Sequence, residues 1–552
     1  MKIKHLLLTI AALAGSLAAT GADAFVNLTP KPKAMTVSDG SYSLRNGLTV
    51  SSNGLKPDWA FEAARFTVDL NRATGLGAEL TGAKQADITV AVDTLIAPEG
   101  YRLNVTPAGV AIAASTTDGL YYAFQTLKKI LPPNVMAGVK KEGAYSLPLV
   151  AIDDEPRYDY RGFMLDVSRH FFTVEEVKRM LDVMSYYKLN RFHWHLTDDQ
   201  GWRIEMPEYP RLTTVGATAP NRRFTDMHAK TQYWLNKPYG PYFYTQEQLR
   251  DVVAYAKARH IEVVPEVDMP GHFCAAMTAY PEFSCTPQGE HRVWHDGGIS
   301  SDVLNVENPA AVKFAKDILD TLMDIFPYKT IHIGGDECPT TAWEQNAECQ
   351  AAYKANGFTS PRQHQTKFIK AMADHLKANG REIALWNEAV IENGADLDMV
   401  RDTDATIYCW TVGTADKGAE VATGLGLRSI YTPWGPYYIN RVQDKQNDPP
   451  AAGQGGDDVK ATYNLVPFRT LADGDAPECY GVQGTFWCEH VSDREYMEWL
   501  ALPRLIAIAE AGWTPQSGKD WPDFQKRMSA DRDLLDLNGY PYSPHHMLPR
   551  EN

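Results

Sequence analysis

The sequence of 552 residues lacks the signatures of several protein classes. It has no low-complexity tract and no repeat at a solenoid period, which excludes disordered, fibrous and repeat architectures. Basic residues are outnumbered, since 54 Lys and Arg stand against 69 Asp and Glu and give a net charge of −15. An acidic balance of this size argues against nucleic acid or an anionic membrane as a partner. The hydrophobic content of 44% is that of an ordinary globular protein with a large core.

Cysteine is scarce, and none of the cysteine spacings is that of a zinc site. The seven cysteines are Cys274, Cys285, Cys338, Cys349, Cys409, Cys479 and Cys488. Their spacings allow three local disulfides, 274 with 285, 338 with 349 and 479 with 488, which leave Cys409 over. No cysteine stands near residue 24, so a lipoprotein anchor is not indicated.

Residues 1–24 are predicted to be a cleaved export signal. A basic start at Lys2 and Lys4 precedes a short apolar run, and an Ala-Asp-Ala sequence ends at Ala24. A membrane anchor is the weaker interpretation, because the run is interrupted at Gly15 and Ser16. We therefore expect a periplasmic or secreted protein, a destination that permits disulfides.

Residues 25–155 are predicted to form a small α+β domain. Strand-like alternation occurs at 87–92, 101–115 and 147–152, and the middle segment has the pattern of a hairpin. Residues 58–74 and 119–131 have the spacing of amphipathic helices.

In residues 156–530, segments with the pattern of a strand alternate with segments with the pattern of a helix. Residues 531–552 are assigned to a C-terminal tail. Eight strands are expected, at 162–169, 191–196, 261–268, 330–337, 382–388, 405–410, 427–434 and 480–489. A helix is expected after the first of them, where Thr173 and Glu176 make a capping box. Strands separated by helices form parallel βαβ units, so eight of them predict an α/β fold with a (β/α)8 TIM barrel as the catalytic domain.

The ends of these strands are unusually polar and aromatic, and in such a barrel the active site lies at those ends. They carry Asp166 and Arg169, Asp198 and Asp199, Asp268 and His272, Asp336 and Glu337, Trp386 with Glu388, Trp410, Trp434 with Tyr438, and Trp487 with Glu489. A single Trp is more often part of a core than a ligand wall. Four successive strands that end in Trp, together with carboxylates and an arginine, instead favour stacking on a sugar.

The His193 and His195 pair allows a rival interpretation, because two histidines at a spacing of two lie on one face of a strand and can ligate a metal. A metal site would need further histidines at later strand ends, where only His272 and His332 are available. We therefore favour packing of this pair against Trp194 and neighbouring acids, and expect no metal and no cofactor.

The adjacent acids Asp336 and Glu337 follow two glycines, Gly334 and Gly335, at the end of the fourth strand. Strand neighbours point to opposite faces, and glycine permits the backbone to leave that geometry. Consecutive carboxylates are badly placed to flank a sugar as in ordinary retaining or inverting glycosidases. They suit a reaction in which one protonates the leaving oxygen and the other steers a nucleophile that belongs to the substrate, such as a 2-acetamido group.

The chain resembles the β-N-acetylhexosaminidases of glycoside hydrolase family 20 over nearly its whole mature length. The resemblance lies in "GLYYAFQTLKKIL", "DVSRHF", "LNRFHWHLTDDQGWR", "PEVDMPGH", "HIGGDE", "WNE", "YCW" and "FWCEH". It implies exo-acting, retaining, substrate-assisted hydrolysis of terminal N-acetylglucosamine or N-acetylgalactosamine residues. Glu337 would be the general acid and then the base, and the neighbouring charge of Asp336 would favour its protonated state. Asp336 would orient the acetamide and stabilise the oxazolinium-like intermediate.

The same resemblance assigns the remaining site residues. Arg169 would hold the outer sugar hydroxyls, with Glu489 beside it, and Asp198 with His272 would form a relay behind Glu337. The expected aromatic walls are Trp386, Trp410 and Trp487.

One segment departs from many bacterial members, which have Tyr-x-Asp where this chain has Tyr438, Asn440 and Arg441. Tyr438 would bind the acetamide carbonyl, with Tyr437 as the alternative, and Asn440 would replace the aspartate. Tyr-x-Asn-Arg is similar to animal lysosomal members, which implies that Arg441 contacts acidic substrates.

Three functions remain in competition at this point: the hexosaminidase, a glycan-binding protein on the same scaffold, and a metal-dependent hydrolase. The expected partner is a carbohydrate with a terminal N-acetylhexosamine, not nucleic acid and not a membrane. A homodimer is compatible with the sequence.

Overall fold

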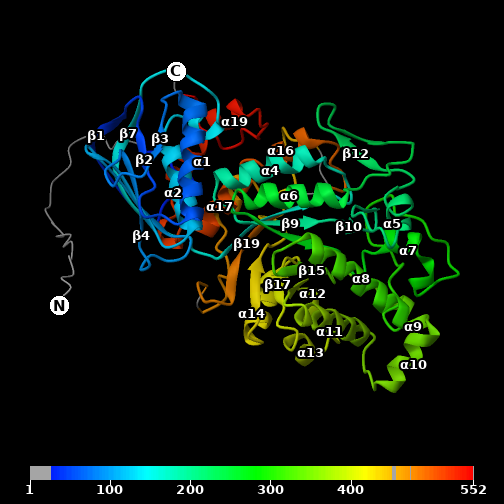
Figure 1. Cartoon of the computed structure of the whole chain (residues 1–552). Coiled ribbons are helices and arrows are strands. Elements are labelled where there is room, and N and C mark those ends of the chain that lie inside the picture. Colours follow the sequence, from blue (N-terminus) through cyan, green and yellow to red (C-terminus); the bar gives the residue numbers. More distant parts are fainter. Residues whose placement is uncertain (1–25, 450–455, 473, 551–552) are drawn as a thin grey trace, which may run out of the picture.

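The computed structural model describes residues 26–449, 456–472 and 474–550. The predicted export signal therefore lies outside the described residues. Two units are visible, a small sheet domain in blue and cyan and a barrel that contains the rest of the chain (Figure 1). The sheet domain ends with a strand at Asp154, and the barrel begins with a strand at Tyr160.

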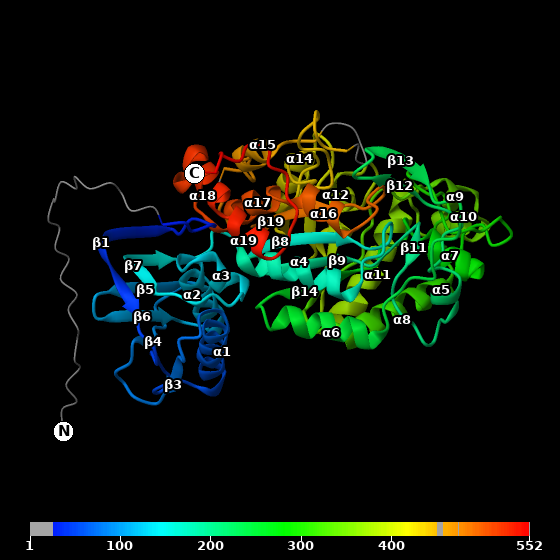
Figure 2. The ribbon, with the colours of Figure 1, turned by 90° about the horizontal axis from the view of Figure 1, so that it is seen from above.

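The small domain is a seven-stranded mixed sheet with helices on one face (Figure 2). In spatial order its strands are β1 (Ala34–Leu44), β7 (Tyr145–Asp154), β5 (Tyr101–Thr106), β6 (Gly109–Ala114), β4 (Ile88–Val92), β2 (Thr49–Ser51) and β3 (Glu79–Thr81). Its helices are α1 (Pro57–Thr74), α2 (Thr117–Ile130) and α3 (Pro133–Ala137). The predicted hairpin is formed by β5 and β6, which pair antiparallel. Phe66 of α1 stacks on Phe124 of α2 with ring centroids 4.4 Å apart, so the helices share one core with the sheet.

The second unit is a closed barrel of eight parallel strands, which confirms the predicted TIM barrel. In chain order the strands are β8 (Tyr160–Asp166), β9 (Arg191–His195), β14 (Glu262–Glu266), β15 (Thr330–His332), β16 (Glu382–Trp386), β17 (Thr406–Cys409), β18 (Arg428–Tyr431) and β19 (Cys479–Phe486). β19 pairs with β8 and closes the ring. All eight carboxyl ends therefore meet at one rim.

Helices surround the barrel. The longer ones are α4 (Val174–Tyr186), α6 (Gln246–Lys257), α8 (Pro309–Ile325), α11 (Arg362–Ala378), α14 (Ala415–Gly424), α17 (Arg504–Trp513) and α18 (Trp521–Ala530). The shorter elements are β10 (Thr197–Asp198), β11 (Gly201–Trp202), α5 (Arg211–Thr214), β12 (Arg223–Asp226), β13 (Thr231–Trp234), α7 (Cys274–Ala279), α9 (Thr341–Gln345), α10 (Ala347–Ala355), α12 (Glu388–Ile391), α13 (Leu397–Arg401), α15 (Val459–Asn464), α16 (Arg494–Ala501) and α19 (Arg532–Leu537). The capping box of Thr173 and Glu176 is present at the start of α4. No helix in the described part of the chain is long and apolar enough to cross a membrane.

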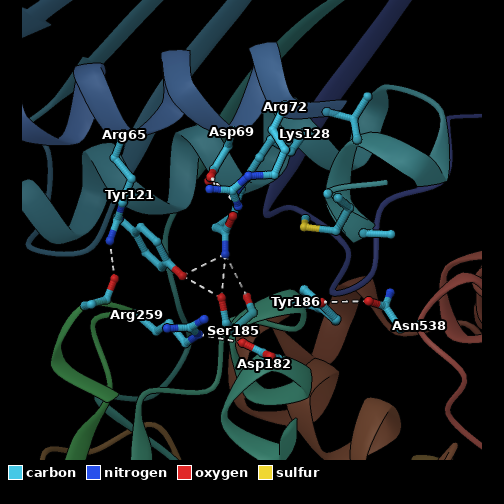
Figure 3. Close-up of a pocket in the computed structure, with 16 residues that line it drawn as sticks. Arg65, Asp69, Arg72, Tyr121, Lys128, Asp182, Ser185, Tyr186, Arg259 and Asn538 are labelled. Carbon is cyan, nitrogen blue, oxygen red and sulfur yellow. Dashed lines mark hydrogen bonds and ion pairs between the residues drawn. The ribbon is translucent and has the colours of Figure 1, made fainter. Parts of the chain in front are cut away.

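The two units meet at a polar junction between α1 and α2 on one side and α4 on the other. A cavity of about 350 Å³ lies there, with charged side chains around it (Figure 3). Gln125 donates to the hydroxyl oxygens of Tyr121 and Ser185 at 2.7 and 2.6 Å, which ties α2 to α4. The described lining of this cavity contains none of the candidate site residues, so we assign the cavity to the domain junction.

Candidate active site

The acid pair stands on backbone that has left the strand geometry. β15 ends at His332, and Gly334, Gly335 and Glu337 follow with φ of 67°, 89° and 44°. A Cβ at Gly334 would lie 1.8 Å from Asp268 Oδ1, so only glycine fits there. Asp336 is buried, whereas the side chain of Glu337 is 39% exposed. The glycines thus turn one acid into the barrel and leave the other at its mouth.

Asp336 lies against a second buried carboxyl, that of Asp268, which follows β14. Burial and the charge of Asp336 raise the pKa of Asp268 well above its usual value. Burial also raises the pKa of Asp336 to about 6, although the charge of His272 and a hydrogen bond from Asp268 oppose the rise. Two carboxylates in one dry site cannot both ionise easily, so they share a proton, and Asp268 is the one that holds it.

His272 connects Glu337 to two further acids. Its Nδ1 lies 3.1 Å from Asp198 Oδ1 and 3.2 Å from Asp199 Oδ2, and its Nε2 lies 3.4 Å from Glu337 Oε2. Burial alone would lower the pKa of His272, but the carboxylate of Asp198 holds it well above its usual value. The structure therefore brings Asp198, His272 and Glu337 together in the order expected for the relay.

Arg169 lies beside this relay with a buried guanidinium. Its Nη2 is 2.7 Å from Asp198 Oδ2, its Nη1 is 3.3 Å from Asp166 Oδ2, and its Nε donates to Gln200 Oε1 at 2.7 Å. Its guanidinium carbon also lies 5.1 Å from the ring centre of Trp487. These contacts fix the orientation of the planar guanidinium at the rim of the barrel. A fixed orientation is what an arginine needs to hold two adjacent sugar hydroxyls.

The expected aromatic walls lie together. Trp487 is 5.9 Å from Trp386 and 6.3 Å from Tyr438, and Tyr438 stacks on Trp410 at 5.9 Å, measured between ring centroids. Tyr438 also lies in the electrostatic field of Asp336. Tyr437 is fully buried in the barrel core instead, so the geometry favours Tyr438 for the pocket.

Two further predicted contacts carry buried oxygen atoms without a protein partner, Asn440 Oδ1 and Glu489 Oε2. Buried polar atoms are normally hydrogen-bonded, so unpaired ones at a pocket are suited to ligand hydroxyl or amide groups. Arg441 lies next to them, with its guanidinium carbon 3.9 Å from the ring centre of Trp434, and the charge of Glu489 acts on it.

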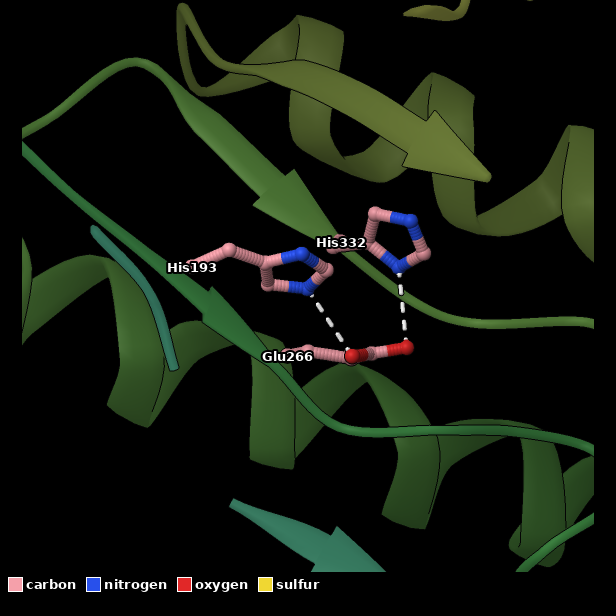
Figure 4. Close-up of side chains that lie close together, drawn as sticks. All are labelled: His193, Glu266 and His332. Atoms are coloured by element: carbon pink, nitrogen blue, oxygen red, sulfur yellow. Dashed lines mark ion pairs between the residues drawn. The ribbon is translucent and has the colours of Figure 1, made fainter. Parts of the chain in front are cut away.

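A buried carboxylate, Glu266, lies against His193 and His332 (Figure 4), and His195 contacts the same acid. Glu266 Oε2 lies 2.6 Å from His195 Nδ1 and 2.9 Å from His193 Nε2, and Oε1 lies 3.1 Å from His332 Nδ1 and accepts from Trp386 Nε1 at 2.8 Å. Both oxygens are therefore engaged with protein groups. His195 and Trp386 are hydrogen-bonded to this acid, and His193 and His332 lie within ion-pair distance of it, so the cluster forms a buried hub around Glu266.

This hub continues into the relay. His195 Nε2 is 2.8 Å from Asp198 Oδ2. Although burial would lower it, the charges of Glu266 and Asp198 raise the pKa of His195 to about 10, so the ring is an imidazolium. One buried chain of charges thus runs from Glu266 through His195, Asp198 and His272 to Glu337.

Sequence reasoning missed Glu266, and it placed Asp268 and Glu388 at strand ends without giving either of them a role. Glu266 ends β14 and Asp268 follows it by two positions, a spacing that could have placed both side chains on the same face. Glu388 accepts from Trp410 Nε1 at 2.9 Å. Burial and the charge of Asp336 raise the pKa of Glu388 well above its usual value, so it is a neutral acid that supports the Trp410 wall.

All seven cysteines are free in the structure, including those of the three pairs that the cysteine spacings allow. Cys479 begins β19 and Cys488 follows its end, which separates them by roughly 30 Å at ~3.3 Å per residue. The thiol that lies against Cys285 is that of Cys349, not that of Cys274.

Buried acids that differ in protonation, an arginine fork and a group of indole rings at the rim of a TIM barrel are suited to breaking a glycosidic bond. The class of protein is therefore a TIM-barrel glycoside hydrolase. Comparison with family models identifies the family within this class. Residues 158–516 match the glycosyl hydrolase family 20 catalytic domain, and residues 26–155 match domain 2 of that family. The chain belongs to glycoside hydrolase family 20.

Relatives of the chain are β-hexosaminidases. A beta-hexosaminidase of Porphyromonas gingivalis is 35% identical over 96% of this chain, which spans 65% of the length of that relative. A beta-hexosaminidase of Akkermansia muciniphila is 33% identical over 79% of this chain and 84% of its own length. Among solved structures, the family 20 exo β-N-acetylglucosaminidase of Vibrio harveyi in complex with N-acetylglucosamine has a TM-score of 0.80 and 30% identity over 94% of this chain and 78% of its own.

Proposed function

We propose that this protein is an exo-acting β-N-acetylhexosaminidase that removes terminal N-acetylglucosamine or N-acetylgalactosamine residues by retaining, substrate-assisted hydrolysis. The observation that carries the proposal is the divergence of the adjacent acids, with Asp336 buried and the side chain of Glu337 39% exposed. Two carboxylates so placed cannot flank a glycosidic bond, but they can act on two different groups of one sugar. The printed names of the relatives support the same substrate class.

In the proposed reaction the substrate supplies the nucleophile. Asp336 accepts the acetamide N–H, so that the acetamide oxygen attacks the anomeric carbon while Glu337 donates a proton to the leaving oxygen. The ring formed carries a positive charge, which the Asp336 carboxylate stabilises in a dry site. Glu337 then takes a proton from water as the water opens that ring, and His272 at 3.4 Å holds Glu337 in line for both steps.

The test is the stereochemistry of the first product. Proton NMR of early hydrolysis of a 4-nitrophenyl N-acetyl-β-glucosaminide should show the β-anomer of N-acetylglucosamine before mutarotation. The α-anomer as first product would overturn the mechanism. Sugar binding without nitrophenol release would instead support the glycan-binding alternative, and loss of turnover in a chelator would support the metal-dependent one.

The rate is expected to fall below about pH 6, because Asp336 acts only when ionised. Burial raises the pKa of Asp336 to about 6, so the carboxyl is neutral below this pH and charged above it. A neutral Asp336 cannot stabilise the cationic intermediate, and kcat/KM should fall about tenfold per pH unit on the acid side. A pH profile of kcat/KM for the wild-type enzyme measures this limb.

The matched control for the pH profile is Asp268→Asn. An asparagine donates permanently the hydrogen bond that protonated Asp268 gives to Asp336, so the acid limb should remain in this variant. A wild-type profile that is flat down to about pH 4 would contradict the assignment of the limb to Asp336.

Arg441 is expected to favour acidic substrates. This proposal rests on the position of its guanidinium, which lies over the ring of Trp434 and near Glu489. A hydrogen bond to a charged group contributes about 1.5–3 kcal/mol, so Arg441→Ala should lower kcat/KM on a 6-sulfated N-acetylglucosaminide at least about tenfold more than on the neutral sugar. Arg469→Ala, at an exposed arginine, is the control. An unchanged preference in Arg441→Ala would contradict the role.

We further propose that the protein is exported to the periplasm or secreted, on the strength of the basic, apolar and Ala-Asp-Ala segments of residues 1–24. Fractionation of the native host with an antibody to the protein tests this. Recovery of the full-length chain in the cytosol would contradict it.

A further inference from the structure

Two buried cysteines from different loops meet beside the loop that carries the acid pair. Cys285 lies between β14 and α8, and Cys349 lies in α10, in the segment that follows Glu337. Both are buried, and the thiol of Cys349 is near enough to that of Cys285 to raise its pKa. Cys285 Sγ also lies 3.6 Å from Leu304 O, and Cys349 Sγ lies 3.5 Å from Asn305 Oδ1. The two sulfur atoms therefore contact consecutive residues of the chain.

One asparagine fixes the backbones of both cysteines. Asn346 Nδ2 donates to Cys285 O at 3.0 Å, and Asn346 Oδ1 accepts from Cys349 N at 3.1 Å. The same two segments are joined again by Trp343 Nε1, which donates to Leu304 O at 3.0 Å. Contacts that do not involve sulfur thus hold the backbones of the two cysteines close together. A disulfide requires such closeness of the two backbones.

Other described thiols have different surroundings. Cys274 Sγ lies 3.2 Å from Arg292 O, whereas Cys409 and Cys488 contact carbonyl groups of their own strands. Cys338 lies against Gly271 instead. Cys285 and Cys349 are therefore the pair whose contact and backbone frame favour a bond.

We propose that Cys285 and Cys349 form a disulfide in the exported protein, a modification that joins the loop after β14 to the segment after the catalytic acids. The oxidant is another disulfide. Its S–S bond breaks and takes up the two electrons and two protons that the thiols of Cys285 and Cys349 lose, and one S–S bond forms between the two cysteines. The hydrogen bond with Cys349, together with burial, raises the pKa of Cys285 far above its usual value. The bond should accordingly form during folding, before the thiols are enclosed.

The function of such a bond would be to brace Glu337. The acid follows two glycines and has a positive φ itself, so its own segment supplies little stiffness. A covalent tie on the far side of α9 would hold the segment that leads away from it.

The experiment counts thiols in denaturant with and without reductant, on full-length mature protein from two sources. One sample is exported, and the other is reduced, unfolded and refolded in a glutathione redox buffer, so that the test does not depend on where the protein resides. In both, the wild type should show two fewer thiols without reductant than with it. A peptide map should join the fragments that contain Cys285 and Cys349.

Four variants identify the partners. Cys285→Ser and Cys349→Ser should show the same thiol count with and without reductant, whereas Cys274→Ser and Cys338→Ser should keep the difference of two. Reduction should lower the Tm of the wild type by roughly 5 °C and leave that of Cys285→Ser unchanged. Equal counts in refolded wild type, or loss of the difference in Cys338→Ser alone, would overturn the proposal.

Discussion

Replacement of Glu337 by Gln is expected to lower kcat/KM on unactivated N-acetylglucosaminides by at least about 10²–10⁴-fold, the usual contribution of general acid catalysis. Glu337 is the more exposed acid of the pair, and His272 Nε2 lies 3.4 Å from its Oε2. Glutamine keeps the size of the side chain and cannot give a proton to the leaving oxygen. The rate of release of N-acetylglucosamine from its β-1,4-linked dimer measures the loss.

The size of the loss should depend on the leaving group. A nitrophenolate needs little protonation, so Glu337→Gln should keep a larger fraction of its activity on the aryl glycoside than on the dimer. Glu344→Gln, at an exposed acid in α9, is the matched control and should behave as wild type. Equal losses on both substrates would point to a structural role of Glu337 and against acid catalysis.

The fold was predictable because its signals are local and repeated. Each strand has a continuous apolar run, each helix has a spaced stripe, and the capping box of Thr173 and Glu176 marks one boundary. Eight such units permit few topologies other than a closed barrel. The positive φ values of Gly334 and Gly335 were predictable as well, since no other residue takes that conformation at low cost.

The buried hub around Glu266 was not predictable, because it depends on register between strands. Glu266 pairs with His195 of β9 on one side and with His332 of β15 on the other. A sequence gives the order of the strands and the alternation along each of them, but not which residues stand level across the sheet. The sequence alone therefore could not show that His193, His195 and His332 share one acid.

The contact between Cys285 and Cys349 was missed for a related reason. The spacing of cysteines along the chain favours near neighbours, whereas this pair is brought together by two long loops that leave adjacent strands. Loop conformation is set by many individual contacts, such as those of Asn346, and none of them has a recurring pattern in the sequence.

The charges of the site follow one rule. Every buried acid on the relay is matched by a cation: Glu266 by His195, and Asp198 by Arg169 and His272. Asp336 and Asp268 are the exception, since His272 Nε2 reaches Asp336 Oδ2 only at 3.9 Å and the two acids share a proton instead. A carboxylate with an incomplete set of partners is suited to stabilising a cation that exists only during the reaction.

Asp336→Asn is therefore expected to lower kcat on 4-nitrophenyl N-acetylglucosaminide by about 10²–10³-fold, the usual cost of removing one preorganised electrostatic contact. Asparagine preserves the volume and removes the charge that faces the positive intermediate. The loss should be specific to the acetamido group, because Asp336 acts on that group alone in the proposed mechanism.

The measurement that isolates this effect compares two substrates, the N-acetylglucosaminide and the corresponding glucoside, which carries a 2-hydroxyl in place of the acetamide. The wild type should strongly prefer the former, and Asp336→Asn should lose most of that preference by slowing only the N-acetyl substrate. Asp320→Asn, at an exposed acid of the outer helix α8, should keep the wild-type ratio. Activity of Asp336→Asn within about threefold of wild type would contradict a role of Asp336 in the nucleophilic step. An equal loss on both substrates would contradict it as well, because the glucoside has no acetamide group for Asp336 to orient.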